Sequence, residues 1–303
     1  MSALGQKRTS RHLQPMSALP PKADIAEHTT AAAQDITPST PSGKTPSGKA
    51  ANGCITNPTA LTRIKNAASE VLLCPVCLQT RRVMQTVVLA SQKGGSGKST
   101  LTVGIAIAAV ENGHRVAIID TDPQGTVSNW GRRRAAPEPY VHRLGSGIEL
   151  ERPLLAFRRA GFTLAIIDTP ATHNALSLSA ISVSNMCLIP ARPSPADIEA
   201  TLPTLGAVRK LGKPFAFVLN QAPPRGYRLS EAAAALNAAG ILALPYIVQR
   251  NDHQDALGAG FGVTEFAPEG PAAQEILDLW QYVWKRMKAE SIVREQGPIR
   301  ATG

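Results

Sequence analysis

The segment that decides the fold is TVVLAS at residues 86–91, followed directly by QKGGSGKST at residues 92–100. The first six residues form a short apolar run that is typical of a buried strand, and the next nine contain three glycines and two lysines. An apolar run from Leu101 to Glu111 then predicts a helix, which Asn112 and Gly113 end. A strand, a glycine-rich loop and a helix in this order indicate a phosphate-binding loop.

The residues of this loop are the first candidates for binding. Glycines let successive backbone N–H groups turn inward, and the start of the following helix adds the positive end of its dipole. Within the loop, Lys98 would reach the β- and γ-phosphates, and the Ser99 hydroxyl would bind Mg²⁺. A dinucleotide loop is disfavoured, because that motif needs a glycine where Thr100 stands. The expected nucleotide-binding residues are Gly94, Gly95, Ser96, Gly97, Lys98, Ser99 and Thr100.

Two further apolar runs end in aspartate. Residues 115–120 read RVAIID and continue as TDPQG, and residues 162–168 read FTLAIID. Ligands gather at the carboxyl ends of the strands in open α/β sheets, so Asp120, Asp122 and Asp168 are expected at one edge. An apolar strand that ends in aspartate is the usual Mg²⁺-holding element beside a phosphate loop, which assigns that role to Asp168. An Asp-Pro turn with a capping aspartate is the alternative interpretation at Asp122.

The remaining apolar runs complete the predicted fold. Residues 186–190 and 215–220 predict strands, and residues 147–160, 174–183, 195–211 and 229–239 predict helices. This alternation predicts an α/β protein with a mainly parallel, doubly wound sheet and helices on both faces. A last amphipathic helix at residues 272–288 places Leu277, Trp280, Trp284 and Met287 on one face, which indicates a core stripe.

The phosphate loop departs from the common GxxxxGK(S/T) pattern. Gln92 replaces the first glycine, and a second lysine, Lys93, precedes the Gly-Gly pair. This loop resembles the deviant Walker A motif, KGGxGK(S/T), of the ParA/MinD family of P-loop ATPases. The DTDPQG string at residues 120–125 also resembles a signature of that family. The resemblance runs from about Met84 to Met287 and is closest to ParA-type partitioning proteins.

The resemblance implies specific roles for several residues. In that family the extra lysine, here Lys93, crosses a dimer interface to the phosphates bound by the partner, and Asp122 positions the attacking water. Asn220 would contact adenine, and a turn-forming role before Pro223 is the alternative. The implied ligands are ATP and Mg²⁺. The implied partners are a second copy of the chain, DNA bound without sequence preference, and a ParB-like protein that stimulates weak intrinsic ATP hydrolysis.

Charge and composition divide the chain. It has 303 residues, 43% of them hydrophobic, and a formal net charge of +10, of which residues 1–83 carry +6 from ten Lys/Arg and four Asp/Glu. The repeats MSAL and TPSGK and the shortage of large apolar groups indicate that residues 1–83 are a low-complexity, disordered extension. A misplaced start, a basic tail that binds nucleic acid and a transit peptide are alternatives. Residues 84–288 are expected to form the ATPase domain, and residues 289–303 a flexible tail.

These patterns favour an ATP-dependent dimerising switch that acts in plasmid or chromosome partitioning or in cargo positioning, in the cytoplasm and associated with the nucleoid. A MinD-like membrane-associated positioning ATPase is the alternative, but the tail after Met287 has few large apolar residues, so membrane binding is not expected. Electron transfer would need cysteines in residues 168–183, which contain none. The basic clusters at residues 132–134, 158–159, 209–213 and 285–288 either bind DNA or are solvated helix faces.

Overall fold

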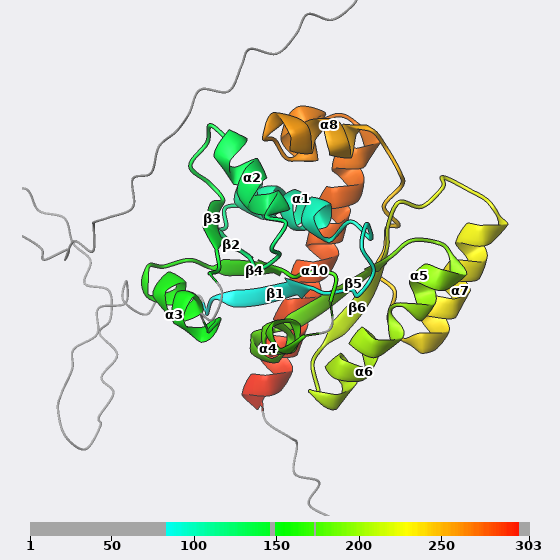
Figure 1. The fold of residues 1–303 in the computed structure, drawn as a ribbon, viewed down its shortest axis with the longest axis horizontal. Helices are drawn as coiled ribbons and strands as arrows, with labels where there is room; N and C mark the ends of the chain where they lie inside the picture. The colour runs from blue at the N-terminus through cyan, green and yellow to red at the C-terminus, as the bar shows by residue number, and fades with distance from the viewer. Residues whose placement is uncertain (1–82, 146–148, 173, 297–303) are drawn as a thin grey trace, which may run out of the picture. The chain divides into compact units, whose positions relative to one another are not determined.

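A six-stranded sheet lies at the centre of the residues that the computed structural model describes, which are 83–145, 149–172 and 174–296 (Figure 1). Its strand order is β3-β2-β4-β1-β5-β6, and all neighbouring strands are parallel. The mainly parallel sheet that the sequence predicts is therefore confirmed. The strands are β1 Gln85–Leu89, β2 Val116–Asp120, β3 Tyr140–Arg143, β4 Leu164–Asp168, β5 Met186–Ala191 and β6 Phe215–Leu219.

The strand register places the three predicted phosphate and acid features at one edge. Leu89, the last residue of β1, pairs with Asp168 at the end of β4. Asp168 also pairs with Asp120, the last residue of β2. Because parallel strands end at the same edge of a sheet, the glycine loop after β1 and both aspartates lie there together.

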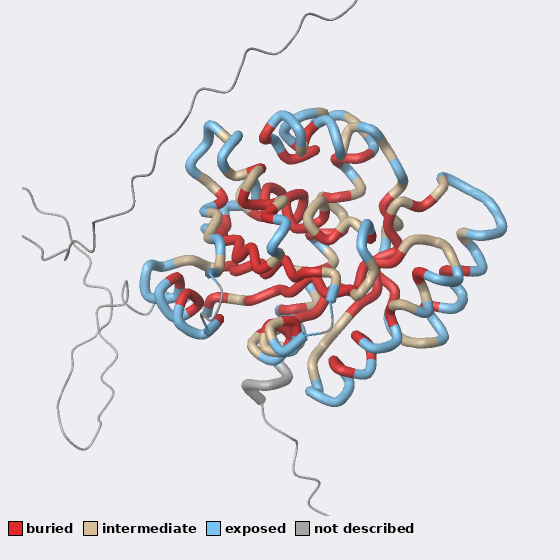
Figure 2. The backbone as a smooth tube through the Cα atoms, viewed as in Figure 1, coloured by how far each residue is buried: buried red, intermediate tan, exposed pale blue. Residues whose placement is uncertain are grey.

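Helices cover both faces of the sheet, as predicted. Successive residues of each strand point to opposite faces, so the buried side chains form two separate core clusters. Figure 2 shows buried strands, with exposure confined mainly to the outer sides of the helices and to the loops. One face carries α1 Lys98–Glu111, α2 Thr126–Arg133, α8 Asp252–Ala259, α9 Val263–Phe266 and α10 Pro271–Gln296. The other carries α3 Glu151–Arg159, α4 Ala175–Val183, α5 Pro195–Glu199, α6 Leu202–Lys210 and α7 Tyr227–Ala239.

The prediction of one helix over residues 195–211 is wrong, because the structure has two helices there, α5 and α6. Pro203 stands in the first turn of α6. Proline has no N–H to donate, and in a continuous helix its ring would clash with the carbonyl of Glu199. The helix is therefore interrupted between Glu199 and Leu202. Both helices have a proline in the first turn, where the backbone N–H that proline lacks would have no partner within the helix.

The final helix, α10, is longer than predicted. It runs to Gln296, so residues 289–296 are helical, in contrast to the flexible tail expected from residue 289. The expected core stripe is confirmed, because Trp280 and Met287 are buried in the cluster under α10, with Leu277 and Trp284 packed against it. Among the described residues, no helix is both long and apolar enough to cross a membrane.

Some expectations concern residues outside the described ones. These are the disordered extension expected over residues 1–83, of which only Val83 is described, with its alternatives, and the tail from residue 297. Four described elements, α2, β3, α8 and α9, were not predicted. All are short, and β3 has four residues with none buried, so it lacks the apolar run that identified the inner strands.

Candidate nucleotide-binding site

The glycine loop has the backbone geometry of an anion cradle. Gly95 and Gly97 adopt left-handed conformations with φ of 74° and 88°, which residues with a side chain rarely adopt. Gly97 is the N-cap of α1, and no side chain caps the helix there. The first N–H groups of α1 therefore remain available to a ligand, and the helix dipole favours an anion. The buried Ser96 hydroxyl also has no hydrogen-bond partner among the residues that the structure describes.

Lys98 lies across the mouth of this loop. Its Nζ donates to the carbonyl oxygens of Ser91 at 3.1 Å and Lys93 at 3.3 Å. Burial lowers the pKa of the Lys98 ammonium, and the charges of Asp168 and Asp122 oppose that shift. A charge that has lost its water while facing neutral carbonyls gains from an added anion. The position of Lys98 thus suits a polyphosphate.

Asp168 and Ser99 are in direct contact. The Ser99 hydroxyl donates to Oδ2 of Asp168 at 2.7 Å, and the Thr102 hydroxyl donates to Oδ1 at 3.4 Å. Burial raises the pKa of Asp168 to about 7; the bond from Ser99 and the charge of Lys98 oppose this, and the charges of Asp120 and Asp122 add to it. A crowded, buried carboxylate beside a hydroxyl is a suitable set of oxygen ligands for Mg²⁺. The two residues expected at the metal therefore fit that ion.

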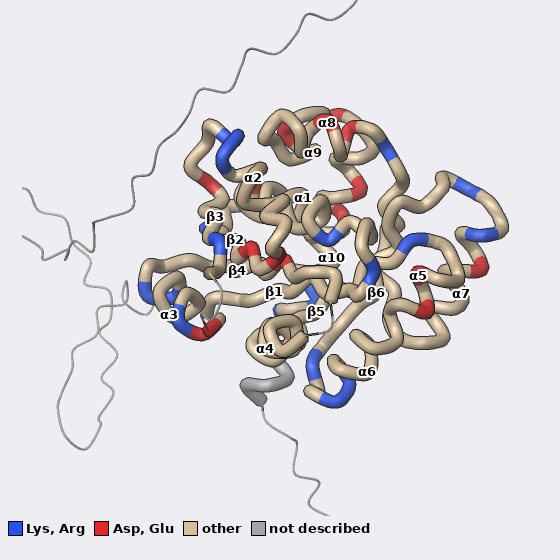
Figure 3. The backbone as a smooth tube through the Cα atoms, in the orientation of Figure 1, with Lys and Arg blue, Asp and Glu red and all other residues tan. Residues whose placement is uncertain are grey.

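Asp120 and Asp122 have different surroundings, although both follow β2. Asp120 is buried, and its carboxylate accepts bonds from the N–H and hydroxyl of Ser128 at 2.8 and 2.6 Å, which anchors the start of α2. Asp122 is half-buried, and its Oδ1 accepts a bond from the N–H of Gln124 at 2.9 Å. Figure 3 shows acidic positions gathered where β2 and β4 end. Of the two, Asp122 is therefore the carboxylate with open access to a ligand.

Asn220 is bound to the phosphate loop. Its Nδ2 donates to the carbonyl oxygen of Ser96 at 2.8 Å, and Gln221 Nε2 donates to that of Gly95 at 2.9 Å. These bonds join the loop after β6 to the loop after β1, across the intervening strand β5. The fit is close, because a Cβ on Gly97 would lie 2.0 Å from Asn220 Nδ2. Asn220 is thus part of the site, and its Oδ1 is left to accept a further bond.

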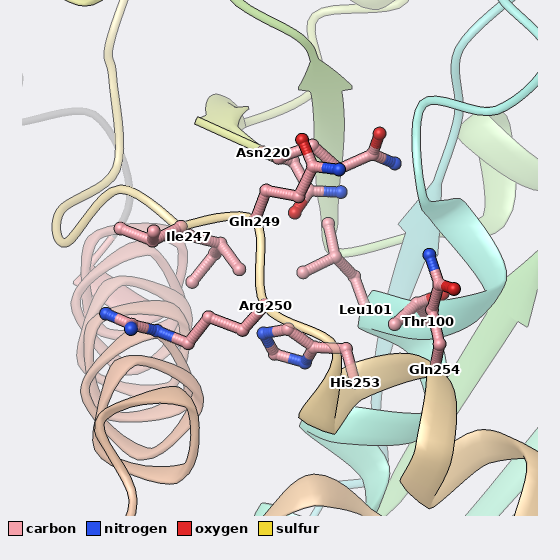
Figure 4. A pocket seen from close by; sticks show the side chains of 10 residues that line it. Thr100, Leu101, Asn220, Ile247, Gln249, Arg250, His253 and Gln254 are labelled. Atoms are coloured by element: carbon pink, nitrogen blue, oxygen red, sulfur yellow. The ribbon is translucent and has the colours of Figure 1, made fainter. Parts of the chain in front are cut away.

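A small pocket adjoins Asn220 and the start of α1 (Figure 4). Leu101 and Ile247 supply apolar walls, and the polar side chains of Thr100, Gln249 and Gln254 lie around them. Nε2 of His253 is buried there without a partner, and burial lowers the pKa of that ring. Arg250 points away toward α10, where it forms an ion pair with Glu275 at 2.7 Å. The pocket has the mixed lining that suits a flat heteroaromatic ring.

Lys93, the second lysine of the loop, is near Asp197 of helix α5. Its N–H donates to the Ser91 hydroxyl at 3.4 Å. Burial tends to raise the pKa of Asp197, but hydrogen bonds from Arg192 and Ser194 and the charges of Arg192 and Lys93 together hold it below its usual value. Arg192 forms an ion pair with Asp197 at 2.9 Å. The Lys93 ammonium thus lies within electrostatic reach of Asp197.

The structure therefore brings the predicted loop, Lys98, Ser99, Asp168 and Asn220 into one site. Sequence reasoning missed Gln221 and the pocket lined by residues 247–254. Gln221 has a left-handed backbone with φ of 51°, which no local motif announces. The pocket residues lie after the predicted helix α7, and His253 and Gln254 stand in the first turn of the unpredicted helix α8. Their one sequence signal is the run of polar side chains at residues 249–255.

A phosphate-binding loop at the carboxyl edge of a parallel sheet, with a Ser–Asp pair suited to Mg²⁺, defines a P-loop nucleotide-binding protein. Residues 87–260 match the family model described as the CobQ/CobB/MinD/ParA nucleotide binding domain. Because this match covers more than half of the chain, the protein belongs to that family. The resemblance that the loop sequence indicated is thereby confirmed.

Known proteins similar to this chain include positioning and partitioning ATPases. The maintenance of carboxysome distribution protein A of Gloeobacter kilaueensis is 29% identical over 190 residues, which is 60% of this chain and 85% of the relative. The chromosome-partitioning ATPase Soj of Thermus thermophilus is 28% identical over 160 residues, 43% of this chain and 64% of Soj. The structure of MinD with Mg-ADP from Pyrococcus horikoshii has a TM-score of 0.55 at 17% identity, covering 69% of this chain and 100% of MinD. That last likeness supports the fold.

Proposed function

We propose that the protein is a Mg²⁺-dependent ATPase that dimerises on ATP and so acts as a switch in partitioning or positioning a cargo. The observation that carries this proposal is the convergence of Lys98, Ser99 and Asp168 around an uncapped helix start. Family membership supports it, since the similar proteins include ATPases named for chromosome partitioning and carboxysome distribution. The cargo would be identified by the partner that engages the ATP-bound state.

The site assigns a task to each residue around the phosphates. The N–H groups of the loop and the first turn of α1 would bind phosphate oxygens, and Lys98 would exchange its two carbonyl partners for the β- and γ-phosphates. Ser99 and Asp168 would hold Mg²⁺. Bound there, Mg²⁺ would neutralise charge on the phosphate oxygens. Thr102, through its bond to Asp168, keeps the carboxylate turned toward Ser99.

Asp122 is the residue that we assign to the attacking water. It is half-buried, lies on the turn after β2, and affects the electrostatics of both Lys98 and Asp168. A carboxylate near a γ-phosphate is suited to orienting water, because it repels the phosphate itself. Asp122→Asn should bind ATP as tightly as the original protein but lose single-turnover hydrolysis. Unchanged hydrolysis by this variant would remove Asp122 from the mechanism.

Lys93 is assigned to the partner's phosphates in an ATP-bound dimer. The Lys93 ammonium is within electrostatic reach of Asp197, and Lys98 already occupies the mouth of the loop, which supports this assignment. The experiment mixes Lys93→Ala with Asp122→Asn, two variants that should each be inactive alone. A mixed dimer contains one complete site, built from the Asp122 of one subunit and the Lys93 of the other. Recovery of hydrolysis supports action across the interface, whereas no recovery contradicts it.

The base is proposed to be adenine, bound beside Asn220 in the pocket of Figure 4. Nδ2 of Asn220 donates one hydrogen bond to Ser96, and its Oδ1 would accept a bond from the ligand. An acceptor selects the exocyclic amino group of adenine over the carbonyl of guanine. Competition of ATP and GTP for a fluorescent nucleotide tests this assignment. Equal affinity for the two nucleotides would contradict it.

Non-specific DNA is the proposed surface on which the dimer assembles, and a ParB-like protein the proposed stimulator of hydrolysis. Figure 3 shows Lys and Arg spread over several elements, including α2, α3 and α6. Arg132 and Arg133 end α2, and Arg158 and Arg159 end α3, with all four side chains exposed. Phosphate contacts by such residues predict an affinity that falls steeply with salt. Binding to DNA fragments of unrelated sequence, with and without ATP, checks this, and the same salt series without ATP is the control.

A further inference from the structure

The turn that carries Asp122 is fixed from three sides. Asp120 accepts a bond from the N–H of Asp122 at 3.1 Å, and the N–H of Gly125 donates to the carbonyl of Asp122 at 2.9 Å. The carboxylate of Asp122 itself accepts the N–H of Gln124. These bonds close the inner side of the turn. Its outer side, with Pro123 and Gln124, is exposed.

Arg143 reaches this outer side from the edge strand. It is the last residue of β3 and pairs in register with Asp120, and the N–H of the following Leu144 donates to the carbonyl of Asp120 at 2.9 Å. Figure 1 shows β3 directly beside β2. From there Arg143 Nη2 donates to the carbonyl oxygen of Pro123 at 3.0 Å. The edge strand is thus bonded to the turn both by backbone and by side chain.

The guanidinium also lies against Gly125. A Cβ added at Gly125 would be 3.1 Å from Nη1 and 3.2 Å from Cζ of Arg143, and Gly125 has a left-handed backbone with φ of 63°. The planar group therefore covers the glycine that ends the turn, while its N–H reaches the carbonyl two residues earlier. Asp122 and Arg143 line one cavity together with Thr121 and Glu149. A flexible surface arginine with no such contacts would not fix the turn.

We propose that Arg143 is a positioning residue for hydrolysis, which holds the turn of residues 122–125 by the Pro123 carbonyl and so orients the Asp122 carboxylate. This inference rests on the proposed function of Asp122 at the attacking water. Among the described residues, Arg143 forms no hydrogen bond with the phosphate loop, so its effect is directed at the rate of hydrolysis and not at nucleotide affinity. The bond from the Arg143 guanidinium to the Pro123 carbonyl is charge-assisted, so it is stronger than a bond between two neutral groups.

Arg143→Ala should lower the single-turnover rate of ATP hydrolysis roughly 10-fold, because a misplaced reacting group costs about that much or more. The Kd for ATP should stay within about twofold, since the residues that hold the phosphates are untouched. Arg143→Lys should recover part of the rate, because an ammonium group can still donate to the Pro123 carbonyl. Arg152→Ala, which replaces an exposed arginine in the first turn of α3, is the matched control and should leave both quantities unchanged.

Amide hydrogen exchange gives a second readout that does not depend on activity. Gln124 and Gly125 should exchange faster in Arg143→Ala than in the Arg152→Ala control. Equal rate and equal exchange in the two variants would overturn the proposal, and so would a loss of ATP affinity equal to the loss of rate. Asp122→Asn, measured alongside, separates the two proposals. If it still hydrolyses ATP, the function of Asp122 fails; if it does not and Arg143→Ala behaves normally, the role of Arg143 alone fails.

Discussion

Gly97→Ala tests the geometry of the phosphate loop most severely. Gly97 has φ of 88°, and a Cβ there would lie 2.0 Å from Nδ2 and 3.3 Å from Cγ of Asn220. No rotation of the loop avoids both problems, because Asn220 is held between the loop and strand β5 by its own bonds. The substitution must therefore displace the Asn220 side chain and break its bond to Ser96.

The expected cost follows from these two effects. A residue with a Cβ in the left-handed region costs about 1–2 kcal/mol relative to glycine. Loss of the Asn220–Ser96 hydrogen bond adds about 0.5–1.5 kcal/mol. The free energy of unfolding without nucleotide should therefore fall by about 1.5–3.5 kcal/mol. The loop would also lose the arrangement that cradles phosphate, so ATP affinity should fall as well.

Urea unfolding in the absence of nucleotide measures the first quantity directly. Gly94→Ala is the matched control in the same loop, because a Cβ there meets nothing within 4 Å and Gly94 is outside the left-handed region. The control should change the free energy of unfolding by no more than about 0.5 kcal/mol. Equal stability of the two variants would refute the reasoning about the contact between the loop and Asn220.

Three further substitutions test other parts of the account. Burial would raise the pKa of Glu265, but hydrogen bonds from Arg134 and Gly262 lower it below the usual 4.5. The ionised Glu265 therefore stabilises the folded protein above pH 4.5, and this contribution is lost as the pH falls through the folded pKa. Glu265→Gln should therefore be less stable than the original protein at pH 7, and acid melts should show this gap closing; a constant gap would contradict the sign. Asn220→Ala should bind ATP roughly 10-fold more weakly and lose discrimination against GTP, with unchanged selectivity as the contrary result in competition binding. Ser99→Ala should need roughly 10-fold more Mg²⁺ for half-maximal nucleotide binding, and an unaltered Mg²⁺ titration would exclude Ser99 from the metal site.

The sequence was most informative where one property dominates. The inner strands are buried on both faces, so they appear as continuous apolar runs, and their final aspartates identified the ligand edge of the sheet. The contact of Ser99 with Asp168 followed from that edge, although 69 residues separate them. The glycines of the loop predicted that its backbone N–H groups turn inward, and the structure shows left-handed conformations at Gly95 and Gly97.

Elements that depend on tertiary contacts could not be predicted in the same way. Strand β3 is exposed, so no apolar run marks Arg143, and its role emerged from its register with Asp120. Helix α2 has eight residues and is anchored by contacts far along the chain, such as the Trp130 indole N–H that donates to the carbonyl of Phe261 at 3.1 Å. Pro203, in contrast, was a visible signal of the break between α5 and α6.

The central claim is that ATP, and not ADP, holds two copies of the chain together. Light scattering after gel filtration of Asp122→Asn, which should retain ATP, measures the mass in ATP–Mg²⁺, in ADP–Mg²⁺ and without nucleotide. We expect twice the monomer mass in ATP–Mg²⁺ and the monomer mass in ADP–Mg²⁺ and without nucleotide. The same mass in all three would contradict it.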